Sequence, residues 1–144
     1  MHARALFLTL MLPCGPVAAA ELASPYGFEA TVARIEAAVE GNAMFRIATA
    51  SASRAAAGQG IAIPGDAVVL VFRNDFARRV LAADPKAGIE APLPFHVRET
   101  GGRVVIAWKK PSDVYRPYAS SSLDVTAAEL DAIFAKIAAD AVAK

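Results

Sequence analysis

Two stretches of the chain place apolar residues at intervals of three or four positions, the spacing of an amphipathic helix. The stretch at residues 28–39 predicts a helix that ends at Gly41 and Asn42. Its apolar face consists of Phe28, Val32, Ile35 and Val39. A second helix is predicted near the C-terminus, where Thr126 and Glu129 have the spacing of a capping box. Its apolar stripe contains Leu130, Ile133, Phe134, Ile137, Ala138 and Ala141.

The partner of these helices is expected to be a sheet, whose clearest strand is the uninterrupted apolar run at residues 67–72. Such a run is typical of a strand that is central and buried. A weaker strand is predicted at 44–50, and the Ala-rich residues 51–60 predict a short helix or a turn. After the central strand, Asn74 or Asp75 is expected to cap a helix that ends at Asp84, because Pro85 disfavours helical geometry in the residue before it.

A hairpin is predicted at residues 93–109, with Gly101 and Gly102 as a two-residue turn. This turn sets Thr100 opposite Arg103. Because side chains alternate along a strand, the two faces of the hairpin then separate. The apolar face carries Phe95, Val97, Val104, Ile106 and Trp108, and the mixed face carries His96, Arg98, Val105, Ala107 and Lys109.

The first twenty residues have the pattern of a cleaved secretory signal. Arg4 precedes an apolar run at 5–12, and three alanines at 18–20 provide a cleavage site after Ala20. The apolar run is too short for a permanent membrane span. Cys14 allows a lipoprotein alternative, although Pro13 and Met11 are poor neighbours for a lipid-modification site. We therefore expect a periplasmic or secreted protein whose mature domain is a single unit at residues 21–144.

Composition narrows the function of the mature chain. The whole sequence has 144 residues, 56% of them apolar, with 15 basic and 14 acidic side chains, one cysteine and two histidines. Removing the signal takes away Arg4, Cys14 and His2, which leaves a neutral domain with one histidine. Disulfides and Cys/His metal sites are therefore excluded within it, and no metal or cofactor is expected. The absence of excess positive charge argues against nucleic-acid binding.

Over roughly residues 25–119 the sequence resembles the domain-of-unknown-function 302 family. The matching segments are Phe28, Thr31, Val32, Arg34 and Ile35, residues 69–72 with Asn74, Ala83-Asp84-Pro85, residues 88–93, and Trp108 with Pro111. The sequence departs from the family at Arg73-Asn74-Asp75 and Glu90-Ala91-Pro92. The resemblance implies an α+β fold with a single antiparallel sheet and helices packed on one face. This is the TATA-binding-protein-like order of strand, helix, four strands and helix. It also implies a homodimer, and it carries over no catalytic residues.

Candidate chemistry concentrates on the mixed hairpin face. His96, Arg98 and Lys109 form a candidate site for a small anionic ligand, since histidine titrates near neutral pH and the other two are cationic. His96 is also a candidate general base with Glu90 or Asp84 as its carboxylate partner. Trp108 is expected in the core rather than against a ligand, and the serines at 120–122 are expected in a loop.

Three classes of function follow from these residues. We favour a non-catalytic binding or accessory domain that takes a small anion or self-associates through its sheet face. The alternatives are a small hydrolase or isomerase, and a structural partner protein of the cell envelope.

Overall fold

The computed structural model describes residues 18–144, in which the strands form one antiparallel sheet with the order β1-β5-β4-β3-β2. The strands are β1 (Ala20–Ser24), β2 (Phe45–Ala50), β3 (Asp66–Phe72), β4 (Leu93–Thr100) and β5 (Arg103–Trp108). Because β1 and β2 are at the two edges, the strand predicted from residues 67–72 lies in the interior of the sheet.

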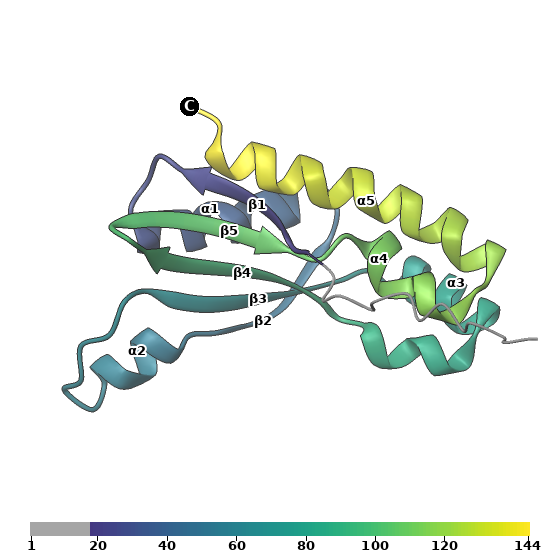
Figure 1. The fold of residues 1–144 in the computed structure, drawn as a ribbon, viewed down its shortest axis with the longest axis horizontal. Helices are drawn as coiled ribbons and strands as arrows, with labels where there is room; N and C mark the ends of the chain where they lie inside the picture. The colour runs from purple at the N-terminus through teal and green to yellow at the C-terminus, as the bar shows by residue number, and fades with distance from the viewer. Residues whose placement is uncertain (1–17) are drawn as a thin grey trace, which may run out of the picture.

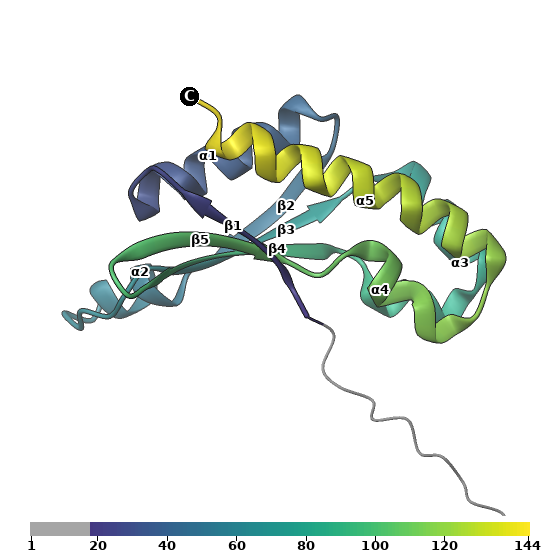
Figure 2. The same cartoon turned by 45° about the horizontal axis from the view of Figure 1, so that its top comes forward.

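Helices cover one face of this sheet. The covering helices are α1 (Phe28–Gly41), α3 (Asn74–Ala83), α4 (Pro111–Tyr115) and α5 (Ser121–Val142), with 3₁₀ turns η1 (Pro85–Glu90) and η2 (Arg116–Tyr118). The short helix α2 (Ala52–Ala57) lies in the connection from β2 to β3 at the end of the sheet (Figure 1) and buries none of its residues. Figures 1 and 2 show α1 and α5 side by side on the covered face, with α3 and α4 alongside α5. The expected α+β class is confirmed, and the shorter helices are insertions into the expected order of strand, helix, four strands and helix.

The core lies between the sheet and the apolar stripes of α1 and α5. Phe134 of α5 is fully buried and stacks on Phe95 of β4, with 4.8 Å between ring centroids. On α1, Val32, Ile35 and Val39 are also fully buried. The helical periodicity of the sequence therefore identified the buried faces of both long helices.

The start of α5 differs from the prediction. The helix begins at Ser121, and the side chain of Ser120 caps it by accepting a hydrogen bond from the Leu123 amide at 3.5 Å. Thr126 is buried inside the helix, where its hydroxyl donates to the Ser122 carbonyl. The predicted capping box at Thr126 and the predicted loop at 120–122 were therefore wrong. The helix begins earlier because Ser120 caps it and because the buried Leu123 extends its apolar stripe toward the N-terminus.

The cap predicted for α3 was also wrong. Its N-cap is Arg73, which makes no side-chain capping bond, whereas its end before Asp84 is as predicted. Instead of capping the helix, Asp75 accepts a hydrogen bond from the Arg73 guanidinium at 2.7 Å, which lowers the pKa of the Asp75 carboxyl. The ion pair thus replaces the expected cap.

The hairpin has the predicted register. Thr100 pairs with Arg103 and His96 with Ala107, while Gly101 and Gly102 adopt φ values of 57° and 72°. Both values lie in the left-handed region, which glycine adopts without a steric penalty. The local sequence was sufficient to predict the pairing of β4 with β5, because the turn fixes the register of both strands.

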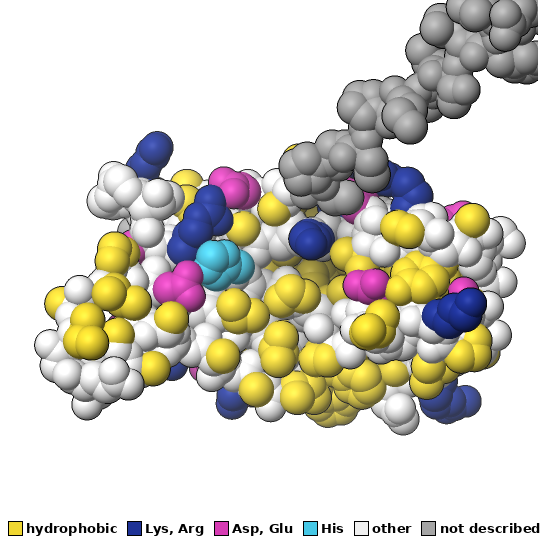
Figure 3. Space-filling model, turned by 60° about the horizontal axis from the view of Figure 1, so that its bottom comes forward, with side chains coloured by type: hydrophobic (Ala, Val, Ile, Leu, Met, Phe, Trp, Pro, Cys, Tyr) yellow, Lys and Arg dark blue, Asp and Glu magenta, His cyan; other side chains and the backbone are white. Residues whose placement is uncertain are grey.

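The second face of the sheet is largely uncovered, which corrects the expectation that β3 is buried. Its burial alternates, with Ala67, Val69 and Val71 buried and Val68, Leu70 and Phe72 only half-buried. On the neighbouring edge strand, Phe45 and Ile47 are 61% and 55% exposed. Figure 3 shows this face, where hydrophobic side chains spread widely and one histidine lies beside acidic and basic side chains. We call this surface the open sheet face.

Most of the predicted signal segment, residues 1–17, lies outside the described residues. Ala20 itself is the first residue of β1 and pairs with Trp108. Within residues 18–144, none of the helices combines the length and apolar character needed to cross a bilayer.

Candidate functional site

The three candidate residues of the hairpin line one pocket of about 390 Å³ at the end of the open sheet face. The pocket lies between β4, β5, the start of β1 and the segment formed by η1 and α4. Its apolar lining consists of Ala19, Leu93, Pro94, Ala107, Trp108 and Val114. Its ionisable lining consists of Glu21, Glu90, His96, Arg98 and Lys109. A volume of this size matches the small end of ligand pockets in proteins.

His96 is held by a carboxylate that the sequence analysis did not identify. Its Nε2 atom lies 2.7 Å from Oδ2 of Asp66, the first residue of β3, and both side chains are about 40% exposed. Asp66 of β3 pairs with Arg98 of the neighbouring strand β4. His96 is two residues before Arg98 and therefore lies diagonally opposite Asp66, on the same face of the sheet. The pairing of β3 with β4 is the signal that would have identified Asp66.

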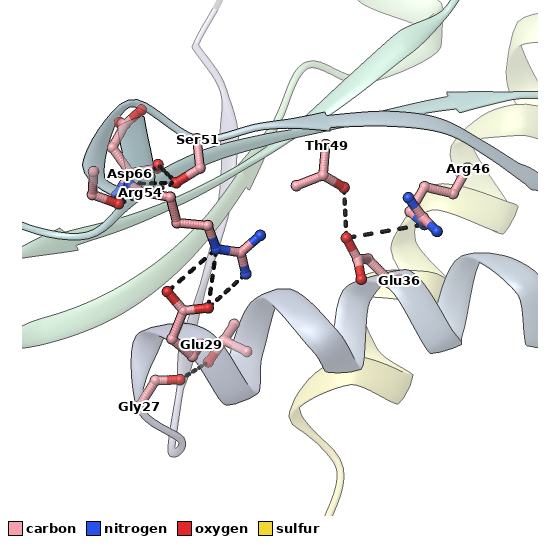
Figure 4. Close-up of polar contacts among 10 residues, drawn as sticks. Gly27, Glu29, Glu36, Arg46, Thr49, Ser51, Arg54 and Asp66 are labelled. Atoms are coloured by element: carbon pink, nitrogen blue, oxygen red, sulfur yellow. Dashed lines mark hydrogen bonds and ion pairs between the residues drawn. The ribbon is translucent and has the colours of Figure 1, made fainter. Parts of the chain in front are cut away.

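The backbone of Asp66 is fixed by α2. Ser51 and Ser53 donate their hydroxyls to the Asp66 carbonyl at 2.7 and 3.2 Å, and the Asp66 amide donates back to Ser53 at 3.0 Å. Figure 4 shows Ser51 and Asp66 in this arrangement. The short helix predicted among residues 51–60 thus has a local function, because it anchors the residue that orients His96.

The same view shows how α2 and β2 are tied to α1. Glu29 accepts hydrogen bonds from the Arg54 guanidinium, the shortest at 2.5 Å, which lowers the pKa of the Glu29 carboxyl. Glu36 accepts a hydrogen bond from the Thr49 hydroxyl at 2.5 Å and lies 3.9 Å from Nε of Arg46. These contacts fix α2, and through it Asp66, relative to the helical layer.

Arg98 is also paired with an acidic residue. Its Nη2 atom lies 2.7 Å from Oε1 of Glu21 on β1, where the Arg98 and Glu21 side chains are 29% and 49% exposed. The positive charge of Arg98 is therefore largely balanced at the pocket wall. The sequence did not predict this pair, because β1 is a short edge strand without a strong pattern of its own.

Lys109 differs from its two neighbours in the candidate site. It is exposed, and no carboxylate of residues 18–144 lies within ion-pair distance of its ammonium. The pocket therefore offers one cation that makes no ion pair with a described acidic side chain.

The two carboxylates proposed as partners of His96 make other contacts. Glu90 lines the pocket but accepts a hydrogen bond from the Tyr118 hydroxyl at 2.8 Å, which raises the pKa of Tyr118. Asp84 caps η1 by accepting from the Lys86 amide at 2.9 Å and is not part of the pocket lining. The structure thus assigns His96 a different acidic partner, Asp66.

The lining combines His96, the Arg98–Glu21 ion pair, Glu90 and Lys109 with apolar side chains, and Asp66 contacts His96 from outside the lining. It contains no serine, threonine or cysteine among the described residues, so it has no side-chain nucleophile of those types. Among residues 18–144 there is also no group of three or more His, Cys, Asp or Glu side chains arranged to hold a metal ion. The arrangement can bind an anion and, at Trp108 and Val114, an apolar group.

Trp108 lies between the core and the pocket. Its ring lies 5.8 Å from Phe95, centroid to centroid, as expected for a residue on the apolar face of the hairpin. It is nevertheless only half-buried and lines the pocket. As the single tryptophan of the chain, it reports on both the core and the pocket.

Comparisons with known proteins agree with this fold. Residues 20–140 match the model of a family described as a domain of unknown function, DUF302. The structure is similar to the crystal structure of an uncharacterized conserved DUF302 protein from Bacillus stearothermophilus, with a TM-score of 0.77 and 18% identity. The similarity covers 85% of this chain and 96% of that chain. No protein with a curated description matches the sequence.

Proposed function

Because the chain belongs to the DUF302 family, whose description assigns no activity, we propose that it is a small non-catalytic binding domain for an anionic ligand. The observation that carries this proposal is the pocket in which His96, Arg98 and Lys109 meet. His96 and Arg98 are each oriented by a carboxylate at 2.7 Å, so both side chains are held in place before a ligand arrives.

Binding is favoured over hydrolysis or isomerisation by the contacts of the acidic residues. Glu90 and Asp84 are engaged with Tyr118 and with the η1 backbone, and the pocket lining offers no hydroxyl or thiol nucleophile among the described residues. The pair formed by His96 and Asp66 is on the open sheet face at about 40% exposure, whereas acid–base catalysis profits from a site that excludes water.

A panel of small anions tests the binding proposal. Titration with phosphate, sulfate, acetate and octanoate, followed by Trp108 fluorescence and calorimetry, should give saturable binding of at least one anion. Replacing His96 and Arg98 together with alanine should weaken that binding without unfolding the protein. If none of the four anions binds, or if the double variant binds as well as the parent, the anion-binding proposal is wrong.

Self-association through the open sheet face is a second candidate, supported by the apolar side chains there. Val68, Leu70 and Phe72 lie on the uncovered side of an interior strand, next to the exposed Phe45 and Ile47. Contiguous exposed apolar surface is characteristic of interaction sites. A second copy is the simplest partner, because the ion pair of Arg98 with Glu21 on this face reduces the charge repulsion between two copies.

The mass of the protein in solution tests this candidate. We expect a dimer by light scattering, which Leu70→Lys should convert to a monomer. Val125→Lys is the matched control, since Val125 is 61% exposed on α5, away from the open sheet face. A parent protein that stays monomeric at high concentration would contradict self-association.

We further propose that the protein is exported and processed after Ala20, on the strength of the basic, apolar and small-residue pattern of residues 1–20. Processing there removes Ala19 from the pocket lining and Ala20 from β1, and it leaves Glu21, the ion-pair partner of Arg98, as the first residue. Mass spectrometry of the protein from cell envelope fractions should find an N-terminus at Glu21. An intact N-terminus in the cytoplasmic fraction would exclude export.

A further inference from the structure

The proposed binding site has a charge distribution that points to the class of anion it takes. We infer that the pocket binds an amphipathic monocarboxylate, with its carboxylate at Lys109 and its hydrocarbon part against Trp108, Pro94 and Val114. This inference rests on the proposed anion-binding function and names the ligand class for the same pocket.

The charge of the ligand follows from which pocket residues already have partners. Arg98 forms an ion pair with Glu21 and His96 contacts Asp66, each at 2.7 Å, while Glu90 accepts from the neutral Tyr118 hydroxyl at 2.8 Å and keeps its negative charge. Among the described residues, Lys109 is the cation of the lining that has no carboxylate within ion-pair distance. One ammonium without a carboxylate partner matches one ligand carboxylate, whereas a phosphate dianion brings a second charge that the nearby carboxylates of Glu21 and Glu90 disfavour.

The apolar part of the ligand follows from the rest of the lining. Leu93, Pro94, Ala107, Trp108 and Val114 contribute from two strands and from α4, so apolar side chains border the pocket on more than one side. A volume of about 390 Å³ is far larger than acetate or phosphate needs. Each methylene buried against such a lining adds about 0.8 kcal/mol, or about fourfold in affinity. A medium-length hydrocarbon chain therefore gains more than a compact anion does.

The position of Lys109 explains why both parts of one ligand can be satisfied together. Lys109 directly follows Trp108, the last residue of β5, so a cationic and an aromatic residue that both line the pocket are adjacent in the chain. Lys110 is the next residue, is also exposed and is not part of the lining. The chain thus provides a matched control lysine one position away.

The test measures binding of acetate, butyrate and octanoate to the purified protein by Trp108 fluorescence and calorimetry at constant ionic strength. Affinity should rise about fourfold with each buried methylene, and octanoate should bind with one-to-one stoichiometry. Octanol and inorganic phosphate should each bind at least about tenfold more weakly than octanoate. Lys109→Gln should weaken octanoate about fivefold or more, and Lys110→Gln should leave it unchanged.

The outcomes separate this inference from the proposed function. If phosphate binds as tightly as octanoate and depends on Lys109, the anion site stands and the amphipathic ligand is wrong. If octanol binds as well as octanoate, or if the two lysine variants behave alike, the assignment of the carboxylate to Lys109 is overturned. If no anion binds, both the inference and the proposed function are wrong.

Discussion

Replacing Gly65 with alanine should destabilise the protein, because the fold leaves no room for a Cβ atom at this position. An ideal Cβ on Gly65 would lie 2.4 Å from Cγ and 2.5 Å from Cδ2 of Phe28, and 2.9 Å from a carboxylate oxygen of Glu99. Phe28 is itself 8% exposed and part of the core. The ring must therefore withdraw by about 1 Å into packed surroundings, and overpacking of this kind costs about 1–3 kcal/mol.

The change also acts on the candidate site. The Gly65 amide donates to Glu99 at 2.6 Å, and the Glu99 amide donates to the Gly65 carbonyl at 2.8 Å. These bonds fix the chain directly before Asp66, whose carboxylate orients His96. A displaced Gly65 backbone should therefore weaken anion binding in addition to stability.

Urea unfolding followed by Trp108 fluorescence measures the effect, with Gly41→Ala as the matched control. A Cβ on Gly41, the last residue of α1, has nothing within 4 Å, so the same substitution there should be neutral or stabilise by up to about 1 kcal/mol. In a Phe28→Ala background the contact with the ring is removed and only the terminal oxygen of Glu99 has to shift, so Gly65→Ala should then cost less. Equal stability of the two glycine variants, or an undiminished cost in the Phe28→Ala background, would show that contact with Phe28 does not set the cost.

Three further predictions concern the core and the pH dependence of stability. Phe134→Ala should cost about 3–5 kcal/mol in urea unfolding because the ring is fully buried, whereas Val125→Ala at an exposed position of the same helix should cost little. Desolvation by burial, and secondly the charge of the nearby Glu90, raises the pKa of Tyr115 from 10.0 to about 12. The stability that the neutral Tyr115 phenol contributes is therefore fully present below pH 10 and is lost as pH rises through 12. Tyr115→Phe should remove this loss in unfolding experiments at alkaline pH, and an unchanged alkaline profile would contradict it. The hydrogen bond from Arg79 lowers the pKa of Glu129 below its ordinary 4.5, so its stabilisation is present above pH 4.5 and is lost as pH falls through the lowered value; a Glu129→Gln protein with the parent's acid-unfolding profile would contradict this.

Patterns local in the sequence predicted the parts of the fold that depend on neighbouring residues. The apolar stripe from Leu130 to Ala141 forms the buried face of α5, and the turn at Gly101 and Gly102 set the pairing of β4 with β5. In both cases the residues that decide the geometry lie within about one turn or one hairpin of each other.

The edge strand β1 and the start of helix α5 were harder to predict from the sequence. The strand β1 was not predicted as a residue range, because its five residues have no run long enough to stand out and it forms only by pairing with β5. The start of α5 was missed because Ser120 and Thr126 are both acceptable caps on sequence grounds, and only burial of Thr126 against the core decides between them.

The residues of the candidate site likewise divide into those that the sequence predicted and those that only strand pairing brought together. Strand periodicity in the sequence was enough to place His96, Arg98 and Lys109 on one face of a hairpin, because alternate residues of a strand lie together. The contacts of His96 with Asp66 and of Arg98 with Glu21, and the lack of a described ion-pair partner for Lys109, depend on the tertiary structure. Those partners come from strands that are 30 and 77 residues away in the chain, so their identity depends on how distant strands pair in the sheet. The open sheet face has the same origin, because an apolar run specifies burial on both sides and the helices of this fold cover only one.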